Sequence, residues 1–157
     1  MNGLALIGYD GSEDAQAAVR GAAASLQTGR VLVVTVWLST AVPAVGGVPL
    51  AALGPAVGGH GEQAEQLERA ARDTASEGAR LARDAGLDDV QPDALPATAA
   101  AQIGNVLADL AHERGATVIV VGRRAISRVQ AVVLGSVSDA TVHSARRPVL
   151  VVPTPED

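Results

Sequence analysis

The fold of this chain is decided by the stretch VIVVGRRAISRVQAVVLGSVS, residues 118–138. It opens on four β-branched residues, Val118 to Val121, and breaks at Gly122. A short apolar run that ends at glycine predicts a strand buried on both faces, as in parallel sheets. After a loop that carries arginines, Gly135 to Ser138 begin an apolar, helix-like segment. A strand, a glycine turn and a helix start place free backbone N–H groups at the carboxyl edge of a sheet, where phosphates and other anions bind.

The composition limits the remaining choices. With 157 residues, 48% of them hydrophobic, the chain has the size and apolar content of one folded domain, and we predict a single domain over residues 1–157. It has one Trp, one Tyr and no Phe, so the core must be built from Val, Leu, Ile and Ala. A net charge of −5 gives no reason to expect nucleic acid or an anionic membrane as a partner.

Lys and Cys are both missing from the sequence, and their absence excludes several mechanisms. All twelve basic residues are Arg, so Walker-A phosphate loops and Schiff-base chemistry are excluded. Without Cys there is no disulfide, thiolate zinc site or cysteine nucleophile. The start of the chain lacks the pattern of a signal peptide, and no apolar segment reaches the roughly 18 residues of a membrane span. We therefore expect a cytoplasmic protein.

Apolar periodicity and turn residues predict strands that alternate with helices, which is typical of a parallel α/β sheet with right-handed crossovers. Ser12 is a good N-cap for the first helix, with Glu13 and Asp14 in its positive first turn. Pro92 and Pro96 remove ladder donors, so the strand that carries them belongs at a sheet edge. The predicted strands are 4–9, 31–37, 90–97, 118–121 and 148–153, and the predicted helices are 13–26, 62–85, 101–114 and 136–145.

Residues 39–61 and 62–85 differ sharply in composition and pattern. Residues 39–61, rich in Pro, Gly, Ala and Val, are predicted to be a flexible loop, which is either a functional cover over a ligand site or an insertion without a role. The helix 62–85 is amphipathic. Its predicted inward residues are Ala64, Leu67, Ala71, Ala75, Gly78, Ala82 and Ala85.

Over essentially its whole length the chain resembles a known family, the universal stress proteins, and two places carry the resemblance. The ending of the first strand, Ile7-Gly8-Tyr9-Asp10-Gly11-Ser12, looks like that family's opening signature. The last third is similar to its nucleotide motif: glycine, two residues, glycine, nine residues, then glycine followed by Ser or Thr. Gly122 supplies the first glycine and Gly135-Ser136 the last pair, at the family's spacing. Ala125 replaces the second glycine, and Arg128 stands where the family usually has a small residue.

The resemblance implies an α/β fold with an open five-stranded parallel sheet in the order 3-2-1-4-5 and helices on both faces. It also implies ATP or another adenine nucleotide as cofactor, with or without Mg²⁺, at the switch point between strands 1 and 4. In family members that bind ATP, the Asp10 position lies near the ribose, the Gly8 position beside the adenosine and the Val36 backbone against the adenine. The glycine loop and the Ser-Val-Ser after it hold the phosphates. The candidate ligand residues are therefore Gly8, Asp10, Val36, Gly122, Arg123, Arg128, Gly135, Ser136, Val137 and Ser138.

Each of these assignments has a structural alternative. Asp10 is also a common turn residue after a strand, and Gly135-Ser136 also suits an ordinary loop and N-cap. Arg123, Arg124 and Arg128 fit phosphate contacts, a solvated loop or a plug that fills an empty site. No catalytic residue and no metal ligand is predicted, because the three histidines lack metal-ligand spacing and no Ser-His-Asp set is discernible.

Three functional classes compete with a nucleotide-binding stress-response module. A phosphorelay receiver is excluded, since it needs an acceptor Asp after strand 3, where the chain has Pro96-Ala97-Thr98, and a Lys, which the chain lacks. A nucleotide-free scaffold that acts through protein–protein contacts is compatible with Ala125 and Arg128. An enzyme that hydrolyses ATP slowly is the third class, and it has no evident base beyond Asp10. We also predict a homodimer through the last strand, residues 148–153, because the implied strand order leaves it at an edge.

Overall fold

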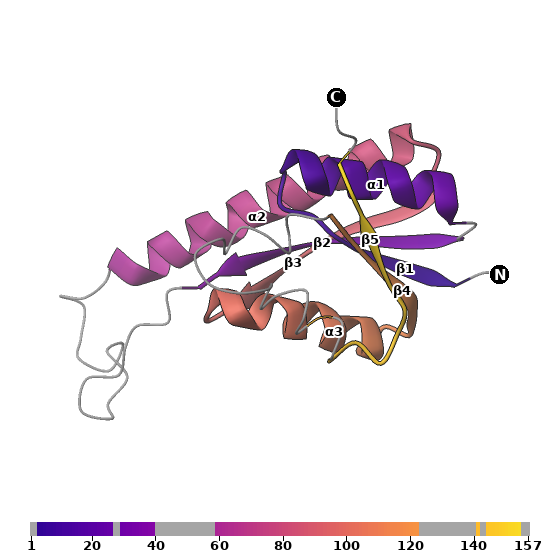
Figure 1. Ribbon diagram of the computed structural model, residues 1–157. Helices are drawn as coiled ribbons and strands as arrows, with labels where there is room; N and C mark the ends of the chain where they lie inside the picture. Colours follow the sequence, from indigo (N-terminus) through magenta and orange to yellow (C-terminus); the bar gives the residue numbers. More distant parts are fainter. Residues whose placement is uncertain (1–2, 27–28, 40–58, 123–140, 142–143, 155–157) are drawn as a thin grey trace.

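The structure is a computed structural model that describes residues 3–26, 29–39, 59–122, 141 and 144–154. Within these residues five parallel strands form one sheet in the order β3-β2-β1-β4-β5, so the predicted fold class and strand order are confirmed (Figure 1). The elements are β1 (Leu4–Gly8), α1 (Glu13–Ser25), β2 (Arg30–Leu38), α2 (Gly59–Asp84), β3 (Asp89–Ala97), η3 (Ala100–Gln102), α3 (Ile103–Glu113), β4 (Ala116–Gly122) and β5 (Val149–Val152).

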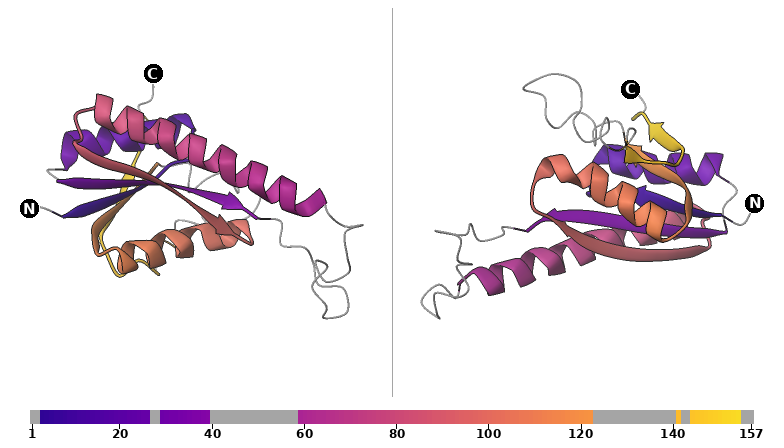
Figure 2. Two further views of the ribbon diagram at one scale, coloured as in Figure 1. Left: turned by 180° about the vertical axis from the view of Figure 1, so that it is seen from behind. Right: turned by 90° about the horizontal axis from the view of Figure 1, so that it is seen from below.

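Helices cover both faces of this sheet. α1 and α2 lie on one face and α3 lies on the other, as the two views of Figure 2 show. Each face has its own aliphatic core, and consecutive strand residues alternate between the two. Ile7 packs on the α1 and α2 side and Leu6 on the α3 side, and neither is exposed to solvent. The central strands are thus buried on both faces, as their unbroken apolar runs predict.

α1 begins where its capping residues predict. Ser12 is the N-cap, and its hydroxyl accepts a hydrogen bond from the N–H of Ala15 at 3.2 Å. Glu13 and Asp14 occupy the first turn, where the positive end of the helix favours acidic side chains.

α2 is where the sequence prediction is partly wrong. Ala71, Ala75 and Ala82 are buried as expected, but Leu67 is 37% exposed and Ala85 is exposed. α2 starts at Gly59 rather than at residue 62, and its first turns extend beyond the ends of the strands (Figure 1). Leu67 belongs to the N-terminal part of this helix. Ala85 already lies past the last helical residue, Asp84.

The remaining bounds differ by a few residues from the prediction. A 3₁₀ turn precedes α3, which therefore starts at Ile103. Of the predicted helix 136–145, only Thr141 and Ser144 are described in helical conformation, and the predicted loop is outside the described residues over 40–58. Among the helices described, none is both long and apolar enough to cross a bilayer.

Candidate functional site

The candidate site lies at the carboxyl edge of β1, β2 and β4. β1 ends at Gly8, which is level with Val34 of β2, so β2 runs on to Leu38 and stands beyond the end of β1. On the other side of β1 lies β4, which ends at Gly122. The strand order reverses direction between β1 and β4, and ligands of open α/β sheets bind at such a switch point.

Gly8 has a packing reason for being a glycine. A Cβ atom there would lie 3.2 Å from Leu107 Cδ1 of α3 and 3.4 Å from Val121 Cγ1 of β4. The structure therefore explains Gly8 by the close approach of α3 and β4 to the end of β1.

β2 holds the chain that leaves β1. The Tyr9 N–H donates to the Val34 carbonyl at 2.8 Å, and the Tyr9 carbonyl accepts from the Thr35 hydroxyl at 2.8 Å. Thr35 is buried, and the sequence prediction missed its role. A single threonine in an apolar strand was the available signal, since a buried hydroxyl needs a hydrogen-bond partner. Tyr9 is thereby fixed, and Asp10 follows it directly, exposed to solvent.

Asp10 forms a tight turn just before Ser12, the N-cap of α1. Its Oδ1 accepts from the Ser12 hydroxyl at 2.5 Å and from the Ser12 N–H at 3.0 Å. Gly11 between them has a φ of +81°, a conformation that favours glycine. The alternative that Asp10 is a turn residue after a strand is therefore confirmed. It does not exclude a ligand, because a carboxylate has about four acceptor positions and these bonds use only one of its oxygens.

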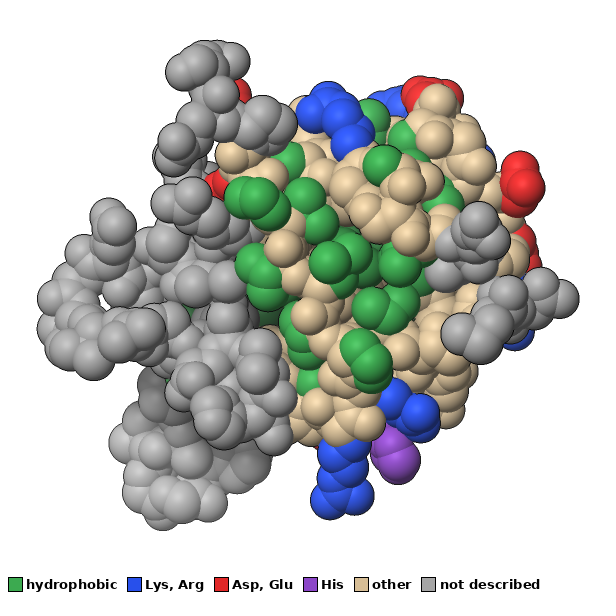
Figure 3. All heavy atoms as spheres, turned by 45° about the vertical axis from the view of Figure 1, so that its right-hand side comes forward, with side chains coloured by type: hydrophobic (Ala, Val, Ile, Leu, Met, Phe, Trp, Pro, Cys, Tyr) green, Lys and Arg blue, Asp and Glu red, His purple; other side chains and the backbone are tan. Residues whose placement is uncertain are grey.

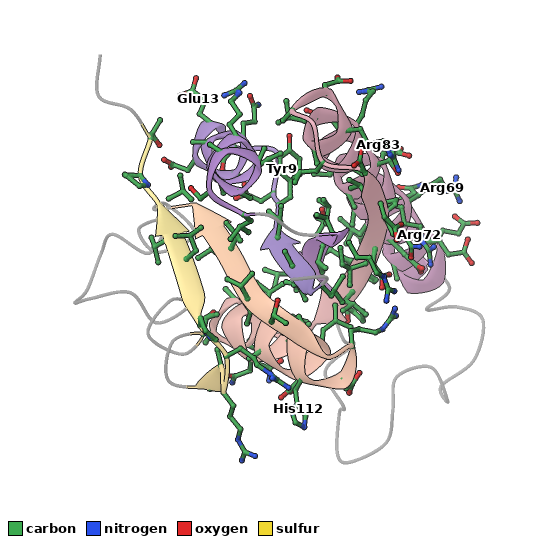
Figure 4. All side chains as sticks on the ribbon, turned by 90° about the vertical axis from the view of Figure 1, so that its right-hand side faces the viewer. Tyr9, Glu13, Arg69, Arg72, Arg83 and His112 are labelled. Carbon is green, nitrogen blue, oxygen red and sulfur yellow. The ribbon has the colours of Figure 1, made fainter. Side chains whose placement is uncertain are left out.

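Tyr9 connects this turn to α2. Its hydroxyl donates to Glu77 Oε1 at 3.3 Å, and burial, followed by the negative charge of Glu77, raises the pKa of Tyr9 to about 12. The ring rests on Gly78, where a Cβ atom would lie 2.7 Å from Tyr9 Cδ1. Figure 4 shows Tyr9 lying between α1 and α2. One buried aromatic side chain therefore holds both helices at the carboxyl edge of the sheet.

The end of β4 lies against the first turn of α1. A Cβ atom on Gly122 would be 2.9 Å from Asp14 Cβ and would overlap the Asp14 carbonyl. Asp14 is only 5% exposed, although the sequence indicated no more than an acidic residue in a first turn. The position of Asp14 in the helix gave no sign that its side chain would be buried, because its burial depends on β4.

Of the remaining candidate residues, the structure describes Val36. It lies on β2, pairs with Leu95 of β3 and packs at the border of the core on the α3 side. Gly8, Asp10, Val36 and Gly122 thus come together at one edge of the sheet. The other predicted ligand residues lie outside the described residues: Arg123, Arg128, Gly135, Ser136, Val137 and Ser138, together with Arg124 and Ala125.

A shallow hollow lies at the opposite, amino edge of the sheet, and it is lined by Leu4, Arg30, Leu32 and Arg114. It is therefore separate from the candidate site. Within the described ranges, no group of three His, Cys, Asp or Glu side chains is placed to hold a metal ion.

The comparisons with known proteins identify the family. The model of the universal stress protein family matches residues 1–153. The chain belongs to the universal stress protein family. Among curated proteins, none matches the sequence.

Solved structures of universal stress proteins show the same fold. UspA from Lactobacillus plantarum is 19% identical, with a TM-score of 0.71, over 96% of this chain and 97% of its own. A universal stress protein in complex with cAMP is 24% identical, with a TM-score of 0.63, over 98% of both chains. The protein from Archaeoglobus fulgidus in complex with dAMP is 19% identical, with a TM-score of 0.61, over 97% of this chain and 98% of its own.

Proposed function

We propose that this universal stress protein binds an adenine nucleotide, ATP foremost, and acts as a binding or signalling module in a stress response. The observation that carries the proposal is the exposed Asp10 carboxylate, held at the switch point beside the glycine ends of β1 and β4. Relatives of the same fold in complex with cAMP and dAMP support an adenine nucleotide as the ligand class.

In this proposal each part of the nucleotide has its own protein partner. The second carboxylate oxygen of Asp10 accepts from ribose hydroxyls, and the β2 backbone at Val36 lies against the adenine. Backbone N–H groups that follow Gly122, and those at Gly135 to Ser138, donate to phosphate oxygens. The guanidinium groups of Arg123 and Arg128 add paired hydrogen bonds to phosphate. No metal held by protein side chains is part of the proposal.

Titration calorimetry with ATP on the parent and on Asp10→Asn tests the ribose contact. Asparagine keeps an acceptor oxygen for Ser12 but loses the charge and the second acceptor. A hydrogen bond to a charged group contributes about 1.5–3 kcal/mol, so we expect at least about tenfold weaker binding. Asp88→Asn, on the exposed turn after α2, is the matched control and should bind like the parent. Equal affinities for the parent and Asp10→Asn would refute the ribose contact.

The same titration applied to the altered glycine motif separates nucleotide binding from its alternative. If position 125 requires a left-handed backbone, alanine costs roughly 1–2 kcal/mol there, so Ala125→Gly should bind roughly 5- to 30-fold more tightly. If Arg128 donates to phosphate, Arg128→Gly should bind more weakly. A parent that does not bind ATP, together with an Arg128→Gly variant that does, would instead indicate a plugged site. The protein would then be a nucleotide-free scaffold that acts through protein contacts.

We further propose binding without appreciable turnover, because the sequence supplies no lysine, cysteine or evident base beyond Asp10. Phosphate release from ATP should stay well below about 1 per second, a low value for ordinary enzymes. Release at or above that rate, abolished in Asp10→Asn, would make the protein an enzyme.

A homodimer through β5 completes the proposal. All four residues Val149 to Val152 are only half-buried although they are apolar, and β5 is an edge strand. An edge of this kind favours pairing with a second copy, and Pro148 and Pro153 at its two ends limit how far that pairing extends.

A further inference from the structure

β3 is the other edge strand of the sheet, and the direction of its backbone groups can be assigned. The Ala97 carbonyl accepts from the Ser39 N–H at 2.9 Å, just past the end of β2, so Ala97 faces β2. Backbone groups alternate along a strand, so the odd-numbered residues of β3 face β2. The residues whose backbone groups point away from the sheet are Val90, Pro92, Ala94 and Pro96.

At each outward-facing residue of β3, the backbone N–H group is either missing or already hydrogen-bonded. Pro92 and Pro96 have no N–H group. The Ala94 N–H donates to Asp93 Oδ1 at 2.9 Å, and the Val90 N–H donates to the Asp88 carbonyl at 2.9 Å. Since an added strand needs donors from the strand it joins, the outer side of β3 offers it none.

Two arginines, one from each face of the sheet, reinforce this edge. Arg83 of α2 donates to the outward Val90 carbonyl at 2.6 Å. The guanidinium group of Arg114, at the end of α3, lies 3.5 Å from Asp93 Oδ2. The other carboxylate oxygen, Asp93 Oδ1, accepts the hydrogen bond from the Ala94 N–H. Figure 4 shows Arg83 on α2 among the side chains beside this edge. On the outer side of β3, the Val90 carbonyl acceptor is therefore occupied, as are the N–H donors of Val90 and Ala94.

β5 differs from β3 in this respect. The Pro148 carbonyl accepts from the Ile119 N–H at 3.0 Å, so the even-numbered residues face β4 and Val149 and Val151 face outward. Among the described residues, none accepts a hydrogen bond from the outward N–H groups of Val149 and Val151. Apolar side chains gather on this side of the molecule, as Figure 3 shows.

We propose that β3 is a closed edge, so that the sheet can be extended at β5 alone and edge pairing stops at two copies. The limit of two rests on the proposed homodimer, whereas the closure of β3 rests on its own contacts. A pair joined through β5 has a β3 strand at each outer edge. If those strands were open, the paired sheets would continue to add copies and form an open polymer.

The test is to open β3 and measure the mass in solution by light scattering over a series of concentrations. The open-edge variant combines four substitutions. Pro92→Thr and Pro96→Thr restore two outward N–H donors. Asp93→Ala frees the Ala94 N–H, and Arg83→Met frees the Val90 carbonyl. We expect its mass to rise with concentration, by at least one further copy above the parent. An unchanged mass at every concentration, with native circular dichroism, would overturn the proposal.

Milder variants and matched controls keep the result interpretable. If the fourfold variant does not fold, Pro92→Thr with Pro96→Thr is measured alone under the same criterion. Arg80→Met removes the same charge from α2 at an exposed site, and Asp93→Asn keeps the Oδ1 acceptor, so both should keep the parent's mass. Restoring Pro92 and Pro96 in the fourfold variant should reverse most of the association. A monomeric parent would refute the homodimer, while the difference between parent and open-edge variant would still decide whether β3 is closed.

Discussion

Tyr9 is the only tyrosine of the sequence, so its ionisation can be followed by near-ultraviolet absorbance without interference from another phenol. Burial and the nearby Glu77 raise its pKa to about 12, against an ordinary value near 10.0. The folded state thus holds this proton more tightly than the unfolded chain does. The associated stability should be fully present below about pH 10 and should be lost as the pH rises toward about 12. Urea unfolding at several alkaline pH values measures this loss.

Glu77→Gln tests the cause of the shift. Glutamine keeps an acceptor for the Tyr9 hydroxyl but removes the negative charge, so the pKa of Tyr9 should fall below about 12. It should stay above 10.0, because burial is the larger cause and is unchanged. Asp84→Asn, exposed at the end of α2, is the charge-matched control. A pKa near 10.0 in the folded parent would contradict the buried position of the Tyr9 side chain.

At this scale, the roles that depend on neighbours in the sequence could be predicted, and those that depend on distant strands could not. Ser12 caps α1 as its residue type and position predict. The sequence does not reveal the roles of Asp14 and Thr35. The burial of Asp14 depends on β4, and the hydrogen bond of the Thr35 hydroxyl depends on the Tyr9 carbonyl, just past the end of β1. The sequence predicts Leu67 in the core, because periodicity shows which side of a helix is apolar but not how far the sheet beneath it extends.

At the scale of elements, the junction of β4 with α1 depends on a glycine. Gly122→Ala would drive a methyl group into the backbone of Asp14, and we expect it to destabilise the fold by about 1–3 kcal/mol. Gly61→Ala is a sharp control, because in α2 a Cβ atom there meets nothing within 4 Å. Replacing a helical glycine by alanine in open space should stabilise by about 0.5–1 kcal/mol. Urea unfolding of both variants should give changes of opposite sign, and equal changes would argue against the close approach of β4 to α1.

The start of α1 is the second junction at this scale. Ser12→Ala removes the cap on the Ala15 N–H and one of the two hydrogen bonds to Asp10, and should cost about 1 kcal/mol of stability. If Asp10 holds a ribose, the looser carboxylate should also weaken ATP binding. Ser76→Ala, whose hydroxyl donates only to the exposed backbone of α2, should change neither. A Ser12→Ala variant with the parent's stability would contradict the capping role.

Most elements could be predicted because their signals are local. Apolar runs bounded by turn-forming residues predicted most of the strands, and the prolines of β3 correctly predicted an edge position. The 3₁₀ turn before α3 was missed, since the sequence there contains no distinctive turn residue. The sequence predicts a loop at the first turn of α2, because Gly59 and Gly61 are weak helix formers, and it predicts the end of this helix one residue too far along the chain.

At the scale of the whole molecule, periodicity and strand–helix alternation gave the α/β class, whereas the resemblance to the family gave the strand order. Residue patterns alone predicted only one part of that order, the edge position of β3, which its prolines indicate. The rest of the order depends on which strands pair across long connections. The location of the candidate site at the ends of β1, β2 and β4 could also be predicted from the strand order. Once this order is given, the carboxyl ends of neighbouring parallel strands must meet at one edge.

The asymmetry between the two edges gives the last prediction, which concerns assembly. Val151 points its N–H away from the sheet, so Val151→Pro should remove one donor of the proposed dimer while leaving the bonds between β5 and β4 in place. We expect light scattering to give a dimer for the parent and a monomer, or a clearly weakened dimer, for Val151→Pro, with native circular dichroism in both. Leu150→Pro is the matched control, because its N–H faces β4 and its loss should lower the stability of the fold itself. Leu150→Asp places a charge on the same strand and should also give monomers. A parent that remains monomeric at micromolar concentration, or a Val151→Pro variant that dimerises as tightly as the parent, would mean that β5 is not the interface.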